Sequence, residues 1–325
     1  MEEVKVSVIC ATYNQKTYIS RCLRSLVSQK TNFKYEIIVH DDASNDGTAN
    51  IVKEYADKYP DLIIPILQSE NQYSQHKNYI SEYVNPLVKG KYRAYCEGDD
   101  FWCDDQKLQR QFDVMEANPQ CSLCVHSTKC VDDDEREVEK AFPKICFDEG
   151  IISTQKVINS FPEWSFQLSS FFIREVDYQK IYTLNKELFR SFHVGDIRIL
   201  YCMALFGDYY YLKKVMSAYT VKAQNSWTTR QNEGTLNNFC NKMITMSNLY
   251  IEYIQKNRPE IDVMNIQRNV IPYYEFYGHI YRKEYKDLLN KKYRKFLGKL
   301  NMKFKIKVYL ISVFPFLKGF LERKN

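Results

Sequence analysis

Short apolar runs alternate with stretches of helical periodicity from Val4 to Met115, and this alternation limits the fold more than any other feature. The run Val4–Cys10 has the length of a strand, and helical spacing follows it at Ile19, Cys22, Leu23, Leu26 and Val27. The pattern then repeats, with strands predicted at 35–39, 62–67 and 92–96 and helices at 51–59 and 108–115. Because alternating strands and helices form βαβ units, the sequence predicts an α/β fold with a mostly parallel central sheet.

Polar turns follow three of these strands, at residues 11–14, 40–48 and 97–100. The third turn, Glu97-Gly98-Asp99-Asp100, has three carboxylates in four residues. Carboxylates this close repel one another, which favours a divalent cation bound through oxygen ligands. A solvated surface turn is the alternative for such a run taken alone. Ligands of parallel sheets bind beyond the carboxyl ends of the strands, so we expect the three turns to form one shared site.

Several protein classes are disfavoured by what the chain lacks. It contains no GxGxxG and no GxxxxGK[ST] motif, which argues against dinucleotide oxidoreductases and P-loop NTPases. Ten scattered cysteines do not resemble a disulfide framework. Cys121 and Cys124 have zinc-like spacing, with His126 and Cys130 nearby, but they lie in a strand-like run. We interpret them as buried structural thiols, with a zinc site as the alternative.

The second half of the chain changes from strands to helices. A strand is predicted at 168–173 and others at 209–212 and 215–221, while the helical spacing from Ile197 to Leu205 puts Asp196 near a helix start. A helix-capping aspartate is the structural interpretation of that residue. Beyond Thr235 the pattern is helical throughout. We therefore predict two domains, a catalytic domain at 1–232 and a helical, basic region at 233–325.

Positive charge is concentrated near the C-terminus. Residues 282–325 contain 14 Lys and Arg against 3 Asp and Glu, a net charge of +11, so the remaining residues carry −5 of the total of +6. Lys303, Lys305 and Lys307 precede an apolar stretch that is too short to cross a bilayer. This tail fits an anionic membrane surface, with packing as an ordinary terminal helix as the alternative. Nucleic acid is disfavoured because no binding motif accompanies the charge.

The N-terminal sequence indicates where the protein works. The acidic start Met1-Glu2-Glu3 does not resemble a signal peptide. We therefore expect a cytoplasmic protein, peripheral on the inner face of the plasma membrane.

Four blocks of this sequence resemble family 2 glycosyltransferases of the GT-A fold. They are VSVICATYNQKTYISRCLRSLVSQ, YEIIVHDDASNDGTANIVKEYA, GKYRAYCEGDDFWCDDQKLQRQ and the weaker VGDIRILYCMALFGDYYYLKKVMSAYTV. The resemblance covers roughly Val4 to Trp227. It implies a Rossmann-like sheet of GT-A type with a helical C-terminal extension.

The resemblance also implies roles for individual residues. Nucleotide-binding positions are implied at Ala11, Thr12, Tyr13, Asn14, Asp41, Asp42, Lys77 and Gly98. Glu97 and Asp99 match the family's DXD motif, which implies a Mn²⁺ or Mg²⁺ cofactor, although Glu97 replaces the first aspartate. Asp196 matches the catalytic base. Lys222 stands where many relatives have a histidine, and as a point charge it is expected to contact the diphosphate.

The implied activity is inverting transfer of a sugar from a nucleotide-diphosphate donor, expected to be a UDP-sugar, to a hydroxyl of a glycan. The basic tail favours a lipid-linked acceptor in capsule, exopolysaccharide or lipopolysaccharide synthesis. One alternative is a degenerate, non-catalytic domain that serves binding or assembly, for which Lys222 is the support. The other is a sugar nucleotidyltransferase, which the lack of a glycine-rich basic loop after the first strand disfavours.

Overall fold

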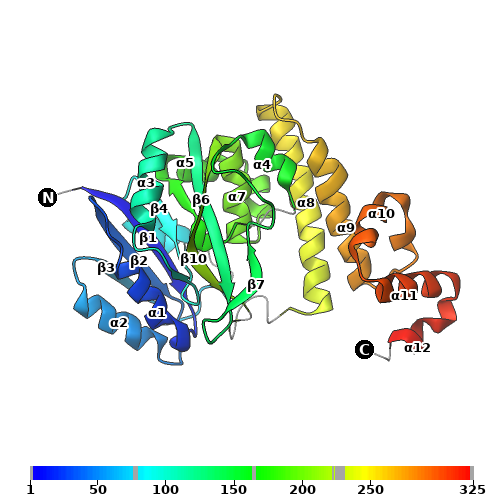
Figure 1. Cartoon of the computed structure of the whole chain (residues 1–325), viewed down its shortest axis with the longest axis horizontal. Helices are drawn as coiled ribbons and strands as arrows, with labels where there is room; N and C mark the ends of the chain where they lie inside the picture. The colour runs from blue at the N-terminus through cyan, green and yellow to red at the C-terminus, as the bar shows by residue number, and fades with distance from the viewer. Residues whose placement is uncertain (1–2, 76–79, 163–165, 222, 224–230, 323–325) are drawn as a thin grey trace. The chain divides into compact units, whose positions relative to one another are not determined.

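A mixed sheet forms the centre of the first part of the chain. The computed structural model describes residues 3–75, 80–162, 166–221, 223 and 231–322. In these residues ten strands join in the order β3-β2-β1-β4-β9-β6-β10-β5, with β7 paired to β6 and β8 to β10 (Figure 1). The strands are β1 (Val4–Thr12), β2 (Lys34–Asp41), β3 (Ile63–Leu67), β4 (Tyr92–Tyr95), β5 (Phe101–Trp102), β6 (Cys121–Val131), β7 (Glu137–Phe142), β8 (Gly150–Ile152), β9 (Phe172–Arg174) and β10 (Asp208–Thr220).

Helices cover this sheet and make up most of the C-terminal part. Those of the first part are α1 (Lys16–Val27), α2 (Thr48–Lys58), α3 (Lys107–Ala117), α5 (Glu175–Gln179) and α7 (Gly195–Phe206), while α4 (Thr154–Ser160) has residues in both parts. The others are α6 (Lys186–Ser191), α8 (Glu233–Asn257), α9 (Ile271–Tyr281), α10 (Arg294–Lys299), α11 (Met302–Val313) and α12 (Lys318–Glu322). The predicted α/β class, with a flanked central sheet and a helical C-terminal region, is confirmed.

The parallel part of the sheet is where the sequence periodicity was strongest. β3, β2, β1 and β4 pair in parallel, and the connections run through α1 and α2, as βαβ units require. The pairs of β9 with β4 and of β9 with β6 are antiparallel, which makes the sheet mixed. The two strands predicted at 209–212 and 215–221 form one strand, β10, because register shifts between Leu212 and Val215 absorb the polar Lys213-Lys214 pair.

The chain divides into two compact units. The first contains residues 1–157, 163–184 and 194–230, and the second contains 158–162, 185–193 and 231–325. In the second unit, Asn265 Nδ2 donates to the carbonyl oxygens of Ile158 (2.8 Å) and Phe161 (3.0 Å), which ties the short segment 158–162 to the helices. α8 begins with a reciprocal capping box between Asn232 and Thr235.

The core of the first unit lies between the parallel strands and their helices. Ile19, Leu23 and Leu26 of α1 are fully buried against the apolar residues of β1 and β2. Cys121 and Cys124 are buried in the same core. In the described part of the chain, no group of potential ligand atoms close enough to hold a metal ion surrounds them.

The lysine at the start of α3, Lys107, is fully buried. Lys107 Nζ donates to Gln111 Oε1 (2.7 Å) and lies 3.9 Å from the centroid of the Trp102 ring. Burial lowers the pKa of Lys107 to about 7, because the protein interior solvates the ammonium poorly. The side chain therefore loses its proton in the folded protein at a pH where the unfolded chain keeps it.

Lys107→Met is predicted to change how stability depends on pH. Between pH 7 and about 10.4 the unfolded chain holds a proton that folded Lys107 does not, so the wild type gains stability as the pH rises through this window. The free energy of unfolding of the methionine variant, relative to that of the wild type, should therefore fall by on the order of a few kcal/mol from pH 7 to pH 10. Urea denaturation at several pH values measures it. A difference independent of pH would contradict a neutral buried lysine.

Candidate active site

The acidic turn between β4 and β5 is held against the end of β1. Gly98 N donates to Ala11 O (2.9 Å), and Cys96 N donates to Ile9 O (3.1 Å). A Cβ atom on Gly98 would stand 2.6 Å from Thr12 Oγ1 and 2.8 Å from Thr12 Cβ, closer than such atoms can approach. Glycine is therefore required for the two backbones to meet here.

The other two turns predicted from the sequence join the same edge. Asp42 N donates to Thr12 O (3.0 Å), and Asn14 N donates to Ser44 Oγ (2.8 Å). Asn14 has a positive φ of 51° and accepts from Asn45 N through Oδ1 (2.9 Å). The turns after β1, β2 and β4 are thus linked by direct hydrogen bonds, with the turn after β1 in the middle.

Asp41 and Asp42 both use their carboxylates to hold loops. Asp41 accepts from the backbone N and hydroxyl of Ser44 (2.9 and 2.6 Å). Asp42 accepts from the backbone N of Gln72 (2.7 Å) and of Tyr73 (3.1 Å). The two bonds of Asp42 order the segment after β3, in which Tyr73 is exposed. Each carboxylate keeps lone pairs for a further donor.

Carboxyl groups from two distant segments influence one another electrostatically in this region. Part of the Glu97 surface is exposed, but many protein atoms surround its carboxyl group and reduce its hydration. This desolvation raises the pKa of Glu97 to about 8, and the negative charges of Asp99 and Asp196 raise it further. Burial also raises the pKa of Asp99, against a smaller lowering by its hydrogen bond from Gln15. Among the described residues, no lysine or arginine forms an ion pair with these three carboxylates.

Asp196 lies in the first turn of α7. Val194 is the N-cap residue, and the Asp196 carboxylate accepts from Ile197 N (2.7 Å). That bond favours the ionised form, yet burial has the larger effect and raises the pKa of Asp196. A carboxylate with a raised pKa is a stronger base than an exposed aspartate.

The acidic residues fit a divalent cation. Glu97 and Asp99 offer carboxylate oxygens, the donors that Mg²⁺ and Mn²⁺ prefer, and their pKa values are raised mainly by desolvation, which a bound cation would offset by favouring the ionised forms. Lys77 and Lys222, the two cationic residues expected here, lie outside the described residues.

Sequence reasoning missed three residues that support this turn, Gln15, Arg21 and Thr220, and did not predict that Asp100 is buried. Gln15 Oε1 accepts from Thr12 Oγ1 (2.8 Å), and the Gln15 side chain also bonds Asp99. Asp100 is buried and accepts from Thr220 N (3.0 Å), and burial raises its pKa well above the usual value. Arg21 and Thr220 come from distant segments, so no local motif could have identified them.

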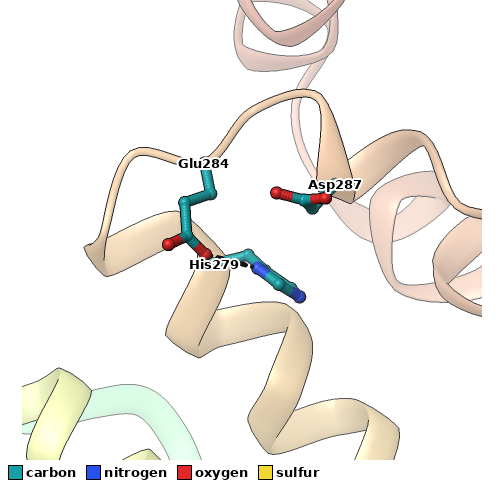
Figure 2. A group of neighbouring side chains, drawn as sticks. All are labelled: His279, Glu284 and Asp287. Carbon is teal, nitrogen blue, oxygen red and sulfur yellow. Dashed lines mark hydrogen bonds and ion pairs between the residues drawn. The ribbon is translucent and has the colours of Figure 1, made fainter.

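A second group of potential ligands lies in the C-terminal unit, at the end of α9 (Figure 2). His279, Glu284 and Asp287 offer one atom each, all within 4.8 Å of one another. However, Arg282 Nε donates to Glu284 Oε2 (2.9 Å), and this bond lowers the pKa of Glu284. Because a guanidinium already neutralises that carboxylate, we interpret the group as a structural closure of the turn after α9.

A family comparison identifies the protein class. The model of glycosyl transferase family 2 matches residues 7–180, which is more than half of the chain. The chain belongs to this family. The resemblance inferred from its motifs is thereby confirmed, and the relatives of this family 2 glycosyltransferase include a Bacillus subtilis protein, TuaG, named as a putative teichuronic acid biosynthesis glycosyltransferase.

Two curated relatives represent the matches. An uncharacterized protein of Mycobacterium tuberculosis is 36% identical over 140 residues, 43% of this chain and 39% of that protein. The Escherichia coli protein WfaP, named as a UDP-Glc:alpha-D-GlcNAc-diphosphoundecaprenol beta-1,3-glucosyltransferase, is 32% identical over 112 residues, 34% of this chain and 41% of that one. The matched region spans about two fifths of the length of the first relatives.

Solved structures extend the likeness over most of the chain. S. aureus TarS 1–349 in complex with UDP-GlcNAc has a TM-score of 0.57 at 15% identity, covering 95% of this chain and 82% of that one. The mannosyltransferase PcManGT from Pyrobaculum calidifontis, in complex with GDP-Man and Mn²⁺, has a TM-score of 0.54 at 14% identity, covering 96% and 88%. Such likeness establishes the fold, and the predicted GT-A class is confirmed.

Gly98→Ala is predicted to displace the acidic turn. The added methyl group would overlap the Thr12 side chain, so the turn must move away from β1 and the carboxylates with it. We expect Mn²⁺ binding, followed by isothermal calorimetry, to weaken at least about tenfold, or about 1.4 kcal/mol. Gly298→Ala in α10 is the control, because no atom of the described residues lies within 4 Å of its added Cβ. Unchanged Mn²⁺ affinity in Gly98→Ala would contradict the tight contact.

Proposed function

We propose that this chain is an inverting, metal-dependent glycosyltransferase. It transfers a sugar from a nucleotide-diphosphate donor, a UDP-sugar, to a hydroxyl of a glycan acceptor. The observation that carries the proposal is that hydrogen bonds join the turns after β1, β2 and β4 at one edge of the sheet, where the charge of Asp196, at the start of α7, also acts on Glu97. A metal-binding acid and a separate base within reach of each other are what such transfer requires.

The leaving group is handled by the acidic turn. Glu97 and Asp99 would hold Mn²⁺ or Mg²⁺, and the ion would neutralise charge that develops on the diphosphate. Gln15 orients the Asp99 carboxylate through its hydrogen bond. Lys222 is proposed as an additional diphosphate contact, by the resemblance of its sequence position.

The nucleotide is proposed to bind along the linked turns. Ala11 and Tyr13 line the base, while Thr12 and Asn14 hold the turn that carries them. The carboxylates of Asp41 and Asp42 face the nucleobase, with Lys77 touching the nucleotide and Gly98 permitting close approach. Lone pairs left over from the loop bonds of Asp42 are available to an N–H of the base.

Asp196 is the proposed catalytic base. It accepts the proton of the acceptor hydroxyl while the anomeric carbon passes through an oxocarbenium-like state. A single base that acts opposite the leaving group inverts the configuration at that carbon. The raised pKa of Asp196 increases its strength as a base, and the Ile197 N–H keeps the carboxylate oriented.

A lipid-linked glycan is the proposed acceptor, in the synthesis of capsule, exopolysaccharide or lipopolysaccharide at the inner face of the plasma membrane. The name of WfaP supports this acceptor class, and the UDP-GlcNAc complex of TarS supports the donor class. The PcManGT complex supports the metal.

Asp196→Asn is predicted to abolish sugar transfer and to leave donor binding unchanged, because asparagine keeps the shape and removes the base. A thermal-shift panel of UDP-, GDP- and dTDP-sugars with Mn²⁺ first selects the donor, and we expect UDP-sugars to stabilise the protein most. Turnover of that donor should fall by about 10²–10⁴ in the variant. Equal loss of UDP binding would mean that Asp196 is structural, and no shift with any donor would refute the proposed activity.

The basic C-terminal region is proposed to contact an anionic membrane surface. In the described part of the chain, no helix is long and apolar enough to cross a bilayer. α11 buries Val308 and Ile311 in the core of the second unit, yet its opposite face exposes a stripe at Met302, Ile306, Tyr309 and Val313. The spacing of four, three and four residues puts these on one side of the helix.

The stripe continues beyond the end of α11. Phe314, Phe316 and Phe320 are exposed, Phe316 by 79%, and the exposed Lys303 and Lys318 stand in the same segment. Apolar side chains next to lysines match the boundary between acyl chains and anionic headgroups. The net charge of +11 from residue 282 onward complements such a surface.

Phe314→Ser combined with Phe316→Ser is predicted to weaken vesicle binding about tenfold or more, because burial of each ring contributes about 1.5–3 kcal/mol. Co-sedimentation with phosphatidylcholine vesicles, with and without phosphatidylglycerol, measures it. Val176→Ser is the control, because Val176 in α5 is also largely exposed. Wild-type binding to neither vesicle, or dimerisation through the stripe instead, would refute the membrane contact.

A further inference from the structure

An arginine of α1 connects the acidic turn to two other segments. Arg21 Nη2 donates to the carbonyl oxygen of Asp99 (3.1 Å) and to Thr220 Oγ1 (2.8 Å). Its Nη1 forms an ion pair with Glu135 Oε1 (3.3 Å) in the turn between β6 and β7. The guanidinium carbon also lies 4.4 Å from the centroid of the Phe101 ring, directly after the acidic turn.

Thr220 completes this connection from the other side. It is the last residue of β10 and is buried. Its Oγ1 donates to Asp99 O (2.5 Å), and its backbone N donates to Asp100 Oδ1 (3.0 Å). The Asp99 carbonyl therefore accepts from both Arg21 and Thr220, so the backbone of the acidic turn is fixed at the residue whose carboxylate would bind the metal.

The same face of α1 also holds the β6–β7 turn. Tyr18, one helical turn before Arg21, donates through its hydroxyl to Asp133 Oδ1 (2.7 Å). Glu135, the ion-pair partner, has a positive φ of 65°, an uncommon backbone conformation for a residue with a side chain. Three segments far apart in the sequence thus meet at one guanidinium.

Packing alone does not explain why an arginine stands at position 21. Its side chain is only 15% exposed, and its buried Nε has no hydrogen-bond partner among the residues that the structure describes. A buried donor left unpaired costs about 1–3 kcal/mol, which an apolar side chain of similar length would avoid. What the arginine adds is a planar fork, with two donating nitrogens aimed at separate acceptors.

We propose that Arg21 is a positioning residue that sets the orientation of the Asp99 carboxylate for metal binding. It acts through the backbone: its guanidinium and the Thr220 hydroxyl together hold the Asp99 carbonyl, which fixes the direction of the Asp99 side chain. The Glu135 ion pair in turn holds the guanidinium. This inference rests on the proposed metal-dependent transfer.

The test uses the full chain, with Mn²⁺ alone and with Mn²⁺ and UDP as probes. Arg21→Lys keeps the positive charge and loses the fork, so it separates geometry from charge. We expect its Mn²⁺ dissociation constant to rise about tenfold and the electron paramagnetic resonance spectrum of bound Mn²⁺ to broaden. Thr220→Val should act in the same direction, and the double variant should lose less than the sum, because both residues hold one carbonyl.

Arg24→Lys is the matched control, because Arg24 is exposed on the same helix. A merely structural role for Arg21 would lower the melting temperature and leave the Mn²⁺ spectrum unchanged, and that outcome refutes the inference. If Arg21→Lys fails to fold, the affinity and spectrum of Thr220→Val decide in its place. Absence of Mn²⁺ binding by the wild type would instead refute the metal site of the proposed function, and this inference with it.

Discussion

Desolvation of carboxylates that share a small volume, together with the repulsion among them, is the constraint on which this site depends. Glu97, Asp99 and Asp100 follow one another within four residues, and Asp196 adds its charge from another part of the chain. The protein holds this turn with the Gln15 amide, the Thr220 backbone, and the Arg21 guanidinium, which donates to the Asp99 carbonyl and pairs with the carboxylate of Glu135, outside the turn. Carboxylate oxygens of Glu97 and Asp99 are therefore left available to a cation.

The scaffold explains how such an arrangement stays ordered. β1 lies between β2 and β4, so the turns that follow these three strands are neighbours. Gly98 lets the acidic turn approach β1, and Asn14 links β1 to the turn after β2. Asp41 and Asp42 are then both structural and available for ligand contact, since a carboxylate can accept more than two hydrogen bonds.

The C-terminal unit differs from the sheet in the composition of its core and in the faces of its helix α11. One cluster of its core joins Phe276 of α9, Phe296 of α10, and Val308 and Ile311 of α11 with Tyr285, Leu288 and Tyr293 of the segment between α9 and α10. Because α11 is apolar on both its buried and its exposed face, its sequence lacks the usual alternation of polar and apolar faces. The exposed stripe became visible when the structure identified which face was already buried.

Local pattern by itself determined the elements of the parallel sheet and the family. Strand-length runs at Val4–Cys10 and helical spacing from Ile19 to Val27 depend on neighbours in sequence, so the chain alone predicted them. Tertiary structure decided the rest: that β10 is one strand through a bulge, that Lys107 is buried, and that Arg21, Thr220 and Glu135 meet at the acidic turn. Contacts between residues more than a hundred positions apart have no local periodicity, and the folded chain creates them.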